Sequence, residues 1–149
     1  MHGLAAARLG QADLALRFFH QTAAIDLADT HVAIDGGVHI AALGGVWMIA
    51  ILGFAGLSIR SDGIGIDPQL PAGWRSLAFG VQWHGRLLKL KIDGVHESLE
   101  ATLEAGEPMT LTVGGEPHDI LRDGPLRVSL RRAGEVAGRK QSAPGDVEP

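Results

Sequence analysis

The stretch DGGVHIAALGGVWMIAILGFAG, residues Asp35–Gly56, places a glycine-flanked histidine in front of a long apolar run. Between Val38 and Leu57 the only ionisable side chain is that of His39. Such a run is typical of a membrane-spanning helix, of a helix buried in a core, or of a helix with a binding site at its start. The choice among these three interpretations decides the fold.

A membrane span is the first alternative, because the run approaches the roughly 20 apolar residues that cross a bilayer. Against it stand His39 at the very start, four glycines within the run, and a downstream half that alternates like a water-soluble antiparallel sheet. These features favour a buried helix over Val38–Phe54 and no membrane partner. A helix that is apolar on all sides needs a large helical body around it, which this chain does not supply. The chain is therefore expected to be the end of something larger or one half of an assembly.

The residues before this run predict two further helices. From Gln11 to Ile25 the apolar residues recur at intervals of three and four, which is the period of an amphipathic helix. Residues Gly3–Leu9 resemble the end of a preceding helix, with Gly10 as its stop. Three aspartates and a glycine pair then interrupt the period, so Asp26–Gly37 is expected to be an irregular loop.

The residues after Gly56 predict strands instead. Short alternating segments separated by turn residues are typical of a β-sandwich or a meander. The expected strands are Leu57–Arg60, Ile64–Asp67, Leu77–Trp83, Leu87–Ile92, Leu99–Glu104, Met109–Val113 and Leu126–Leu130. The clearest hairpin turns at His84-Gly85, and a second one turns at Gly114-Gly115. The fold class is therefore α+β, with helices over residues 1–55, a β-sandwich over 56–130 and a disordered tail over 131–149.

The composition limits the possible functions. The formal charge of −4 and the isoelectric point near 5.9 indicate no basic field, so no nucleic-acid partner is expected. The absence of cysteine excludes disulfides, thiolate metal sites and a cysteine nucleophile. The N-terminal residues lack the pattern of a secretory signal, and the expected location is the cytoplasm.

The candidate site lies at the start of the apolar helix. Gly36 and Gly37 permit positive φ and leave backbone N–H groups uncovered, and a helix start favours negative charge, so His39 there can bind an anion. The alternative is that His39 only caps the helix or packs against it. The spacing of His31, Asp35 and His39 also occurs in metal sites, but it is common by chance and no metal is expected.

Other polar and aromatic residues have ordinary structural interpretations. Asp29 and Asp35 lie in a turn-rich segment and are expected to be solvated or to cap the helix. Trp47 and Trp74 are expected in the core. Trp83 is the better candidate for stacking a sugar, although packing between sheet and helix is its expected use.

Long parts of the sequence resemble a known family. The run GGVHIAALGGVWMIAILGFAGLSIRSDGIGIDPQLPAGWRSLAFGVQWHGRLLKLKI, residues Gly36–Ile92, is similar to the end of glycoside hydrolase family 65, which contains maltose, trehalose and kojibiose phosphorylases and related α-glucoside hydrolases. The upstream HGLAAARLGQADLALRFFHQTAAIDLAD resembles the late helical hairpin of that family's catalytic domain. The most specific pieces are GxHxAALGGxW, GFAGL and DPQLPxGW.

The resemblance implies a fold and a function. Residues 1–55 would be the last helices of an (α/α)6 barrel, and the C-terminal β-sandwich of the family would follow. Phosphorylases of this kind cleave an α-linked disaccharide with inorganic phosphate, and the related hydrolases use water. The resemblance implies that His39 contacts phosphate, with backbone groups of Gly36 and Gly37 beside it. It implies no cofactor.

The resemblance also leaves parts of the family's machinery unmatched. No residue of this chain corresponds to the catalytic acid, so the chain resembles a truncated or split product, expected to be inactive alone. It would be completed by an upstream-encoded chain or a second copy. The alternative is a non-catalytic β-sandwich that binds a partner or a carbohydrate and carries a helical docking hairpin, for which a defined oligomer hiding Val38–Phe54 is expected.

Overall fold

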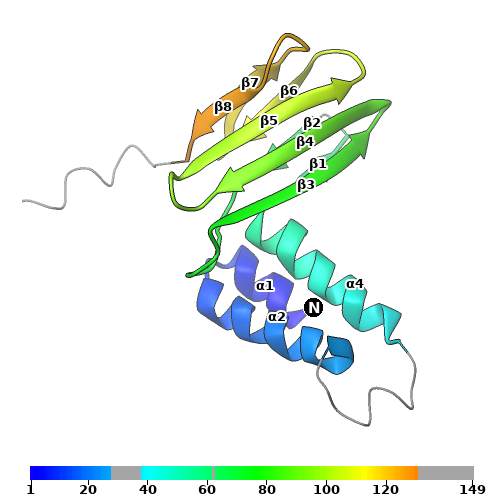
Figure 1. The fold of residues 1–149 in the computed structure, drawn as a ribbon, viewed down its shortest axis with the longest axis vertical. Helices are drawn as coiled ribbons and strands as arrows, with labels where there is room; N and C mark the ends of the chain where they lie inside the picture. The colour runs from blue at the N-terminus through cyan, green and yellow to red at the C-terminus, as the bar shows by residue number, and fades with distance from the viewer. Residues whose placement is uncertain (28–37, 62, 131–149) are drawn as a thin grey trace, which may run out of the picture.

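The computed structural model describes residues 1–27, 38–61 and 63–130 (Figure 1). A helical part comes first and two sheets follow. The helices are α1 (His2–Arg8), α2 (Ala12–Leu27), α4 (Ile40–Met48) and the π-helix η1 (Ile49–Phe54). The strands are β1 (Ser58–Arg60), β2 (Gly63–Ile66), β3 (Ser76–Trp83), β4 (Arg86–Asp93), β5 (Ser98–Ala105), β6 (Met109–Val113), β7 (Glu116–Ile120) and β8 (Leu126–Ser129).

The predicted helical hairpin before the apolar run is confirmed. Gly10 separates α1 from α2 and adopts a φ of 75°, a left-handed conformation that glycine reaches without steric cost. Small residues allow the helices to approach closely. A Cβ placed on Gly3 would lie 2.5 Å from the side chain of Ile49, and one on Gly53 would lie 2.9 Å from Ala7. The helices share a buried cluster of Ala6, Ala7, Ala15, Ile49 and Phe54.

The apolar run forms one continuous helical segment that changes its hydrogen-bonding pattern. It begins as α4 at Ile40, two residues later than predicted, and continues as η1 to Phe54. The N–H of Ala55 donates to the carbonyl of Ala50 at 2.9 Å, the i to i+5 spacing of a π-helix. Within the described parts of the chain, no helix combines the length and the apolarity needed to cross a membrane.

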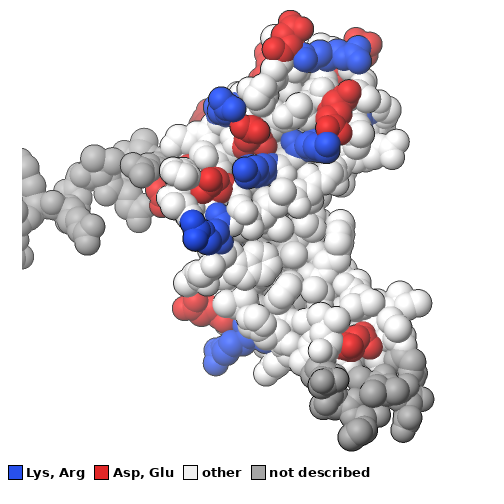
Figure 2. Space-filling view, in the orientation of Figure 1, with Lys and Arg blue, Asp and Glu red and all other residues white. Residues whose placement is uncertain are grey.

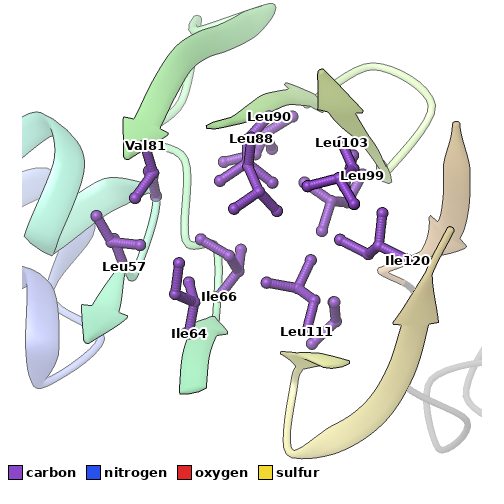
Figure 3. Packing of buried hydrophobic residues seen from close by; sticks show 14 of the residues in the cluster. Leu57, Ile64, Ile66, Val81, Leu88, Leu90, Leu99, Leu103, Leu111 and Ile120 are labelled. Carbon is purple, nitrogen blue, oxygen red and sulfur yellow. The ribbon is translucent and has the colours of Figure 1, made fainter. Parts of the chain in front are cut away.

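The two sheets pack face to face, as the strand pattern predicts. One sheet has the order β1-β2-β6-β7 and the other β3-β4-β5-β8. Figure 3 shows branched aliphatic side chains from both sheets meeting between them. The fully buried residues of this core include Ile64, Ile66, Leu88, Leu90, Ile92, Leu99, Leu111 and Ile120. The core therefore accounts for the alternation seen along the sequence.

The central hairpin has the predicted register. Leu77 pairs with Ile92, and Val81 pairs with Leu88, so the apolar positions of β3 and β4 share the inner face. The connecting residues His84 and Gly85 have φ values of 44° and 74°, which two-residue turns of the I′ type require.

Two sheet features differ from the expectation of an antiparallel sandwich. Strands β2 and β6 pair in parallel, with Ile64 opposite Leu111. The strand β7, which the alternation did not reveal, completes the hairpin at Gly114-Gly115. Its residues Glu-Pro-His-Asp-Ile place only Ile120 in the core, so they lack the alternation of apolar residues that marks a half-buried strand.

The segment DPQLPAGW joins the helical part to the sandwich. The N–H of Gln69 donates to the carbonyl of Phe54 at 2.7 Å. The ring of Trp74 lies 5.2 Å from that of Phe54 and 5.3 Å from that of Phe19, in edge-on arrangements. The guanidinium of Arg8 donates to the carbonyl of Leu57 at 2.8 Å. The motif therefore holds η1 and α2, and the bond from Arg8 ties α1 to the residue just before β1.

The predicted burial of the apolar helix is only partly observed. Its second half is buried, but Ile40 is 80% exposed and Trp47 is 56% exposed, which corrects the prediction of Trp47 as a core residue. The reason is that α2 covers one side of α4 while α1 packs on η1, and no other described segment covers the side that carries Ile40, Leu43 and Trp47. The predicted tail over 131–149 lies outside the described residues.

Candidate functional site

His39 lies at the first turn of α4, where the sequence predicts it. It is the residue that caps the helix, and its carbonyl accepts hydrogen bonds from the N–H groups of Ala42 at 2.8 Å and Leu43 at 3.2 Å. Its side chain is 50% exposed. The imidazole therefore stands at the positive end of the helix dipole and is open to solvent on one side.

The partner of His39 is Asp26, in the last turn of α2. Asp26 Oδ1 accepts a hydrogen bond from the backbone N–H of His39 at 2.9 Å and lies 2.9 Å from the ring Nδ1. The carboxyl side chain is only 8% exposed, and its Oδ2 is buried without a hydrogen-bond donor among the described residues. One carboxylate thus ties the end of α2 to the start of α4.

The electrostatics of this pair favour an ionised Asp26. The backbone N–H of His39 is the largest cause that lowers the pKa of Asp26 below its ordinary 3.8, and the ring of His39 adds to it, while burial acts in the opposite direction. A carboxylate also interacts favourably with the N-terminus of α4. The ring nitrogen Nε2 is the one left for a ligand, because Nδ1 is engaged by Asp26.

The structure describes only part of the predicted site. His39 lies where an anion could reach it, whereas Gly36 and Gly37 lie outside the described residues, as do Asp29, His31 and Asp35. In residues 1–27, 38–61 and 63–130 no three histidine or acidic side chains are grouped as a metal site requires.

Sequence reasoning missed Asp26 by assigning it to the loop. The residue belongs to α2, which continues to Leu27. A carboxylate in the last turn of a helix faces the negative end of the dipole and is unfavourable there without a partner. That mismatch is the sequence signal that could have pointed to a donor across the loop.

The outer face of the sheet β3-β4-β5 carries a shallow groove of about 550 Å³. Its lining includes Gly80, Leu87, Lys89, Lys91, Glu100 and Thr102. Its one aromatic lining residue, Phe79, is half-buried and packs against the core. Trp83 also packs against the core, and the guanidinium of Arg86 lies 5.6 Å from its ring centre. The predicted packing use of Trp83 therefore fits better than sugar stacking.

The helical part presents an apolar surface. Figure 2 shows that the charged side chains gather over the sheets, whereas the visible face of the helical part is mostly uncharged. Ile40, Leu43 and Trp47 follow one another along α4 at helical spacing and are all exposed. Ile25 and Leu27 of α2 are exposed as well. We refer to Ile40, Leu43 and Trp47 as the α4 apolar face.

Comparisons with known proteins connect these features to a family. The family model described as "Glycosyl hydrolase family 65, C-terminal domain" matches residues 57–120. The chain is 35% identical over 125 residues to an alpha,alpha-trehalose phosphorylase of Geobacillus stearothermophilus, a match that covers 84% of this chain and 16% of that protein. It is also 35% identical over 117 residues to a kojibiose phosphorylase of Escherichia coli strain K12, covering 78% of this chain and 15% of that protein.

A solved structure shows the same fold. The structure titled "Putative kojibiose phosphorylase from human microbiome" superposes with a TM-score of 0.76 and 24% identity, covering 89% of this chain and 19% of the other. The chain spans less than a fifth of the length of the curated relatives described above. Residues 57–120 therefore form a C-terminal domain of glycosyl hydrolase family 65.

Proposed function

We propose that this chain supplies the C-terminal part of an α-glucoside phosphorylase or hydrolase of family 65. The observation that carries the proposal is the extent of the similarity. The trehalose phosphorylase match covers 84% of the chain, well beyond residues 57–120, and therefore includes helical residues. The helices and the sandwich would thus belong together as one functional unit. Its location would be the cytoplasm, as the sequence predicts.

His39 would act at the phosphate side of the reaction. In inverting phosphorolysis an acid protonates the glycosidic oxygen while phosphate attacks the anomeric carbon from the opposite face; in hydrolysis an activated water takes its place. The half-exposed imidazole at the positive end of α4 would hold the phosphate anion, with the backbone of Gly36 and Gly37 beside it. Phosphate would be a co-substrate, and no cofactor would be needed.

The chain would be inactive by itself. Among the described residues, the carboxyl group that hydrogen-bonds to His39 is that of Asp26, and its Oδ1 is committed to the histidine. The α4 apolar face supports this proposal, because a soluble enzyme rarely leaves adjacent large apolar side chains exposed. Further helices of a barrel, from an upstream-encoded chain, would cover that face and bring the acid. A second copy could cover the face but would bring no acid, because it has the same sequence.

The experiment is an assay of the purified chain on maltose, trehalose and kojibiose, with and without phosphate. The chain is tested alone and together with any protein encoded immediately upstream. We expect turnover only in the combined sample, and phosphate dependence would distinguish a phosphorylase from a hydrolase. Turnover by the chain alone would overturn the proposed inactivity.

A kinetic variant tests the role of His39 in the combined sample. His39→Ala is expected to raise the KM for phosphate more than the KM for the disaccharide, because the lost contact is to the anion. His96→Ala, in the turn between β4 and β5, is the matched control and should change neither constant. An unchanged KM for phosphate in His39→Ala would remove the phosphate role.

A second candidate function is favoured by the same α4 apolar face. A non-catalytic module would bury this face in a docking interface or a defined oligomer, and the outer groove of β3-β4-β5 would be its ligand surface. Size-exclusion chromatography with light scattering distinguishes the two candidate functions. A defined oligomer that no upstream protein dissociates would favour the module.

A further inference from the structure

Asp26 and His39 form a pair in which one carboxylate oxygen engages both the backbone and the ring of the histidine. We propose that Asp26 is a positioning residue that holds His39 in the tautomer protonated at Nδ1, so that Nε2 is the atom presented to the anion. The identity of the anion as phosphate rests on the proposed function. The assignment of the tautomer, and of Asp26 as its cause, is independent of the proposed function.

The assignment of the proton follows from the chemistry of the pair. An ionised carboxylate only accepts hydrogen bonds, and the lowered pKa of Asp26 keeps it ionised at neutral pH. The 2.9 Å contact between Oδ1 and Nδ1 is therefore a hydrogen bond only if Nδ1 carries the hydrogen. The proton of the neutral imidazole is then on Nδ1, and Nε2 has a free lone pair.

The second hydrogen bond makes this arrangement rigid. The backbone N–H of His39 donates to the same Oδ1, so the carboxylate fixes the position of the residue as well as the ring. The side chain of Asp26 is 8% exposed, so little water can compete for its oxygens. A ring that is already fixed at Nδ1 loses less conformational entropy when a ligand binds at Nε2.

The tautomer determines what the site can do. When His39 is neutral, Nε2 accepts a hydrogen bond from the P–OH group of a hydrogen phosphate. When His39 is protonated, Nε2–H donates to a phosphate oxygen, and the carboxylate of Asp26 balances the charge of the ring. In both states the contact with the anion is made by Nε2, and no covalent bond to the protein forms.

The chain contains a matched control for this pair. Nδ1 of His96 lies 2.9 Å from Oδ2 of Asp93 in the turn after β4, the same distance as between His39 and Asp26. That pair is more open to solvent and does not lie at a helix start. Each pair can be broken by one substitution, Asp26→Ala or Asp93→Ala, without touching the other.

The test is the ring ¹⁵N spectrum of the full chain, labelled at histidine and recorded about two pH units above the ordinary histidine pKa, where free imidazoles are neutral. We expect the His39 signals of the Nδ1–H tautomer in the wild type. In Asp26→Ala the Nε2–H form should gain population, while His96 stays unchanged. In Asp26→Asn the Nδ1–H form should persist, because the backbone N–H of His39 orients the amide oxygen toward the ring.

Two results would overturn the inference. One is a wild-type His39 with an unprotonated Nδ1, which needs no variant and so decides even if Asp26→Ala fails to fold. The other is a folded Asp26→Ala in which His39 keeps the Nδ1–H tautomer. The phosphate role of His39 is tested separately. If His39 has the Nδ1–H tautomer but His39→Ala leaves the KM for phosphate unchanged, the positioning by Asp26 is supported and only the proposed ligand is overturned.

Discussion

Gly56 lies directly against the backbone of Asp67. The N–H of Asp67 donates to the carbonyl of Gly56 at 3.3 Å, and a Cβ on Gly56 would overlap the carbonyl group of Asp67. Gly56 also has a φ of 65°. The second glycine of the GFAGL motif is therefore required for two reasons, its backbone conformation and the approach of the DPQLPxGW segment.

Gly56→Ala is expected to destabilise the chain by at least about 2 kcal/mol, the sum of a strained backbone and an overpacked contact. Urea denaturation followed by tryptophan fluorescence measures this. Gly44→Ala is the matched control: apart from the backbone of its own helix and its chain neighbours, no atom lies within 4 Å of the added Cβ, and alanine is favoured over glycine in a helix interior by up to about 1 kcal/mol. Equal midpoints for the two variants would contradict the close approach at Gly56.

Neighbouring leucines of the hairpin β3–β4 should differ in their importance. Leu90 is 1% exposed in the core, and Leu90→Ala should cost about 2–5 kcal/mol because it leaves a cavity. Leu87, on the same strand, is 39% exposed, and Leu87→Ala should cost less than about 1 kcal/mol. The free energies of unfolding from denaturant titration decide between them, and a reversed order would mean that the hairpin register is wrong.

The features of the fold that could be predicted from the sequence are those that local patterns determine. The period of two in β3 and β4, together with His84-Gly85, specified a hairpin and its inner face, because both strands and the turn lie within 18 consecutive residues. The helix boundaries were correct to within about two residues because the periodicity and Gly10 mark them. The α+β class followed from the change of period near Gly56.

The rest depends on contacts between distant residues. The parallel pairing of β2 with β6 joins Ile64 to Leu111, and no local pattern specifies such a partner. The contact of Asp26 with His39 arises from the packing of α2 on α4, across residues that the period alone did not connect. The phosphate role of His39, Gly36 and Gly37 came from family resemblance and stays a prediction.

Two tryptophans that were both predicted to lie in the core should contribute differently to stability. Trp74 packs against Phe19 and Phe54, so Trp74→Ala should lower the free energy of unfolding by about 2 kcal/mol or more. It should also weaken the packing between the helical part and the sandwich. Trp47 is exposed on the α4 apolar face, and Trp47→Ala should change the free energy of unfolding by less than about 1 kcal/mol. Denaturation of both variants under the same conditions is the measurement. A large loss in Trp47→Ala would show that the chain itself covers this face, for instance in an oligomer.

Asp93 should make the stability of the sandwich depend on pH in the acidic range. The ring N–H of His96 is the main cause that lowers the pKa of Asp93 to about 2 from 3.8, followed by the backbone N–H groups of His96 and Val95. A carboxyl whose pKa is lower in the folded than in the unfolded state stabilises the fold above the unfolded value. That contribution is therefore complete above pH 3.8 and lost as the pH falls toward 2.

Asp93→Asn isolates this contribution, because asparagine keeps an oxygen for the backbone N–H groups but cannot ionise. The variant should be less stable than the wild type near neutral pH, and the difference should shrink steadily as the pH falls from 3.8 to 2. Denaturant midpoints at a series of pH values measure it. Asp123→Asn, in an exposed turn before β8, is the control and should keep the pH profile of the wild type. A difference between wild type and Asp93→Asn that stays constant with pH would mean that Asp93 contributes through its shape and not through its charge.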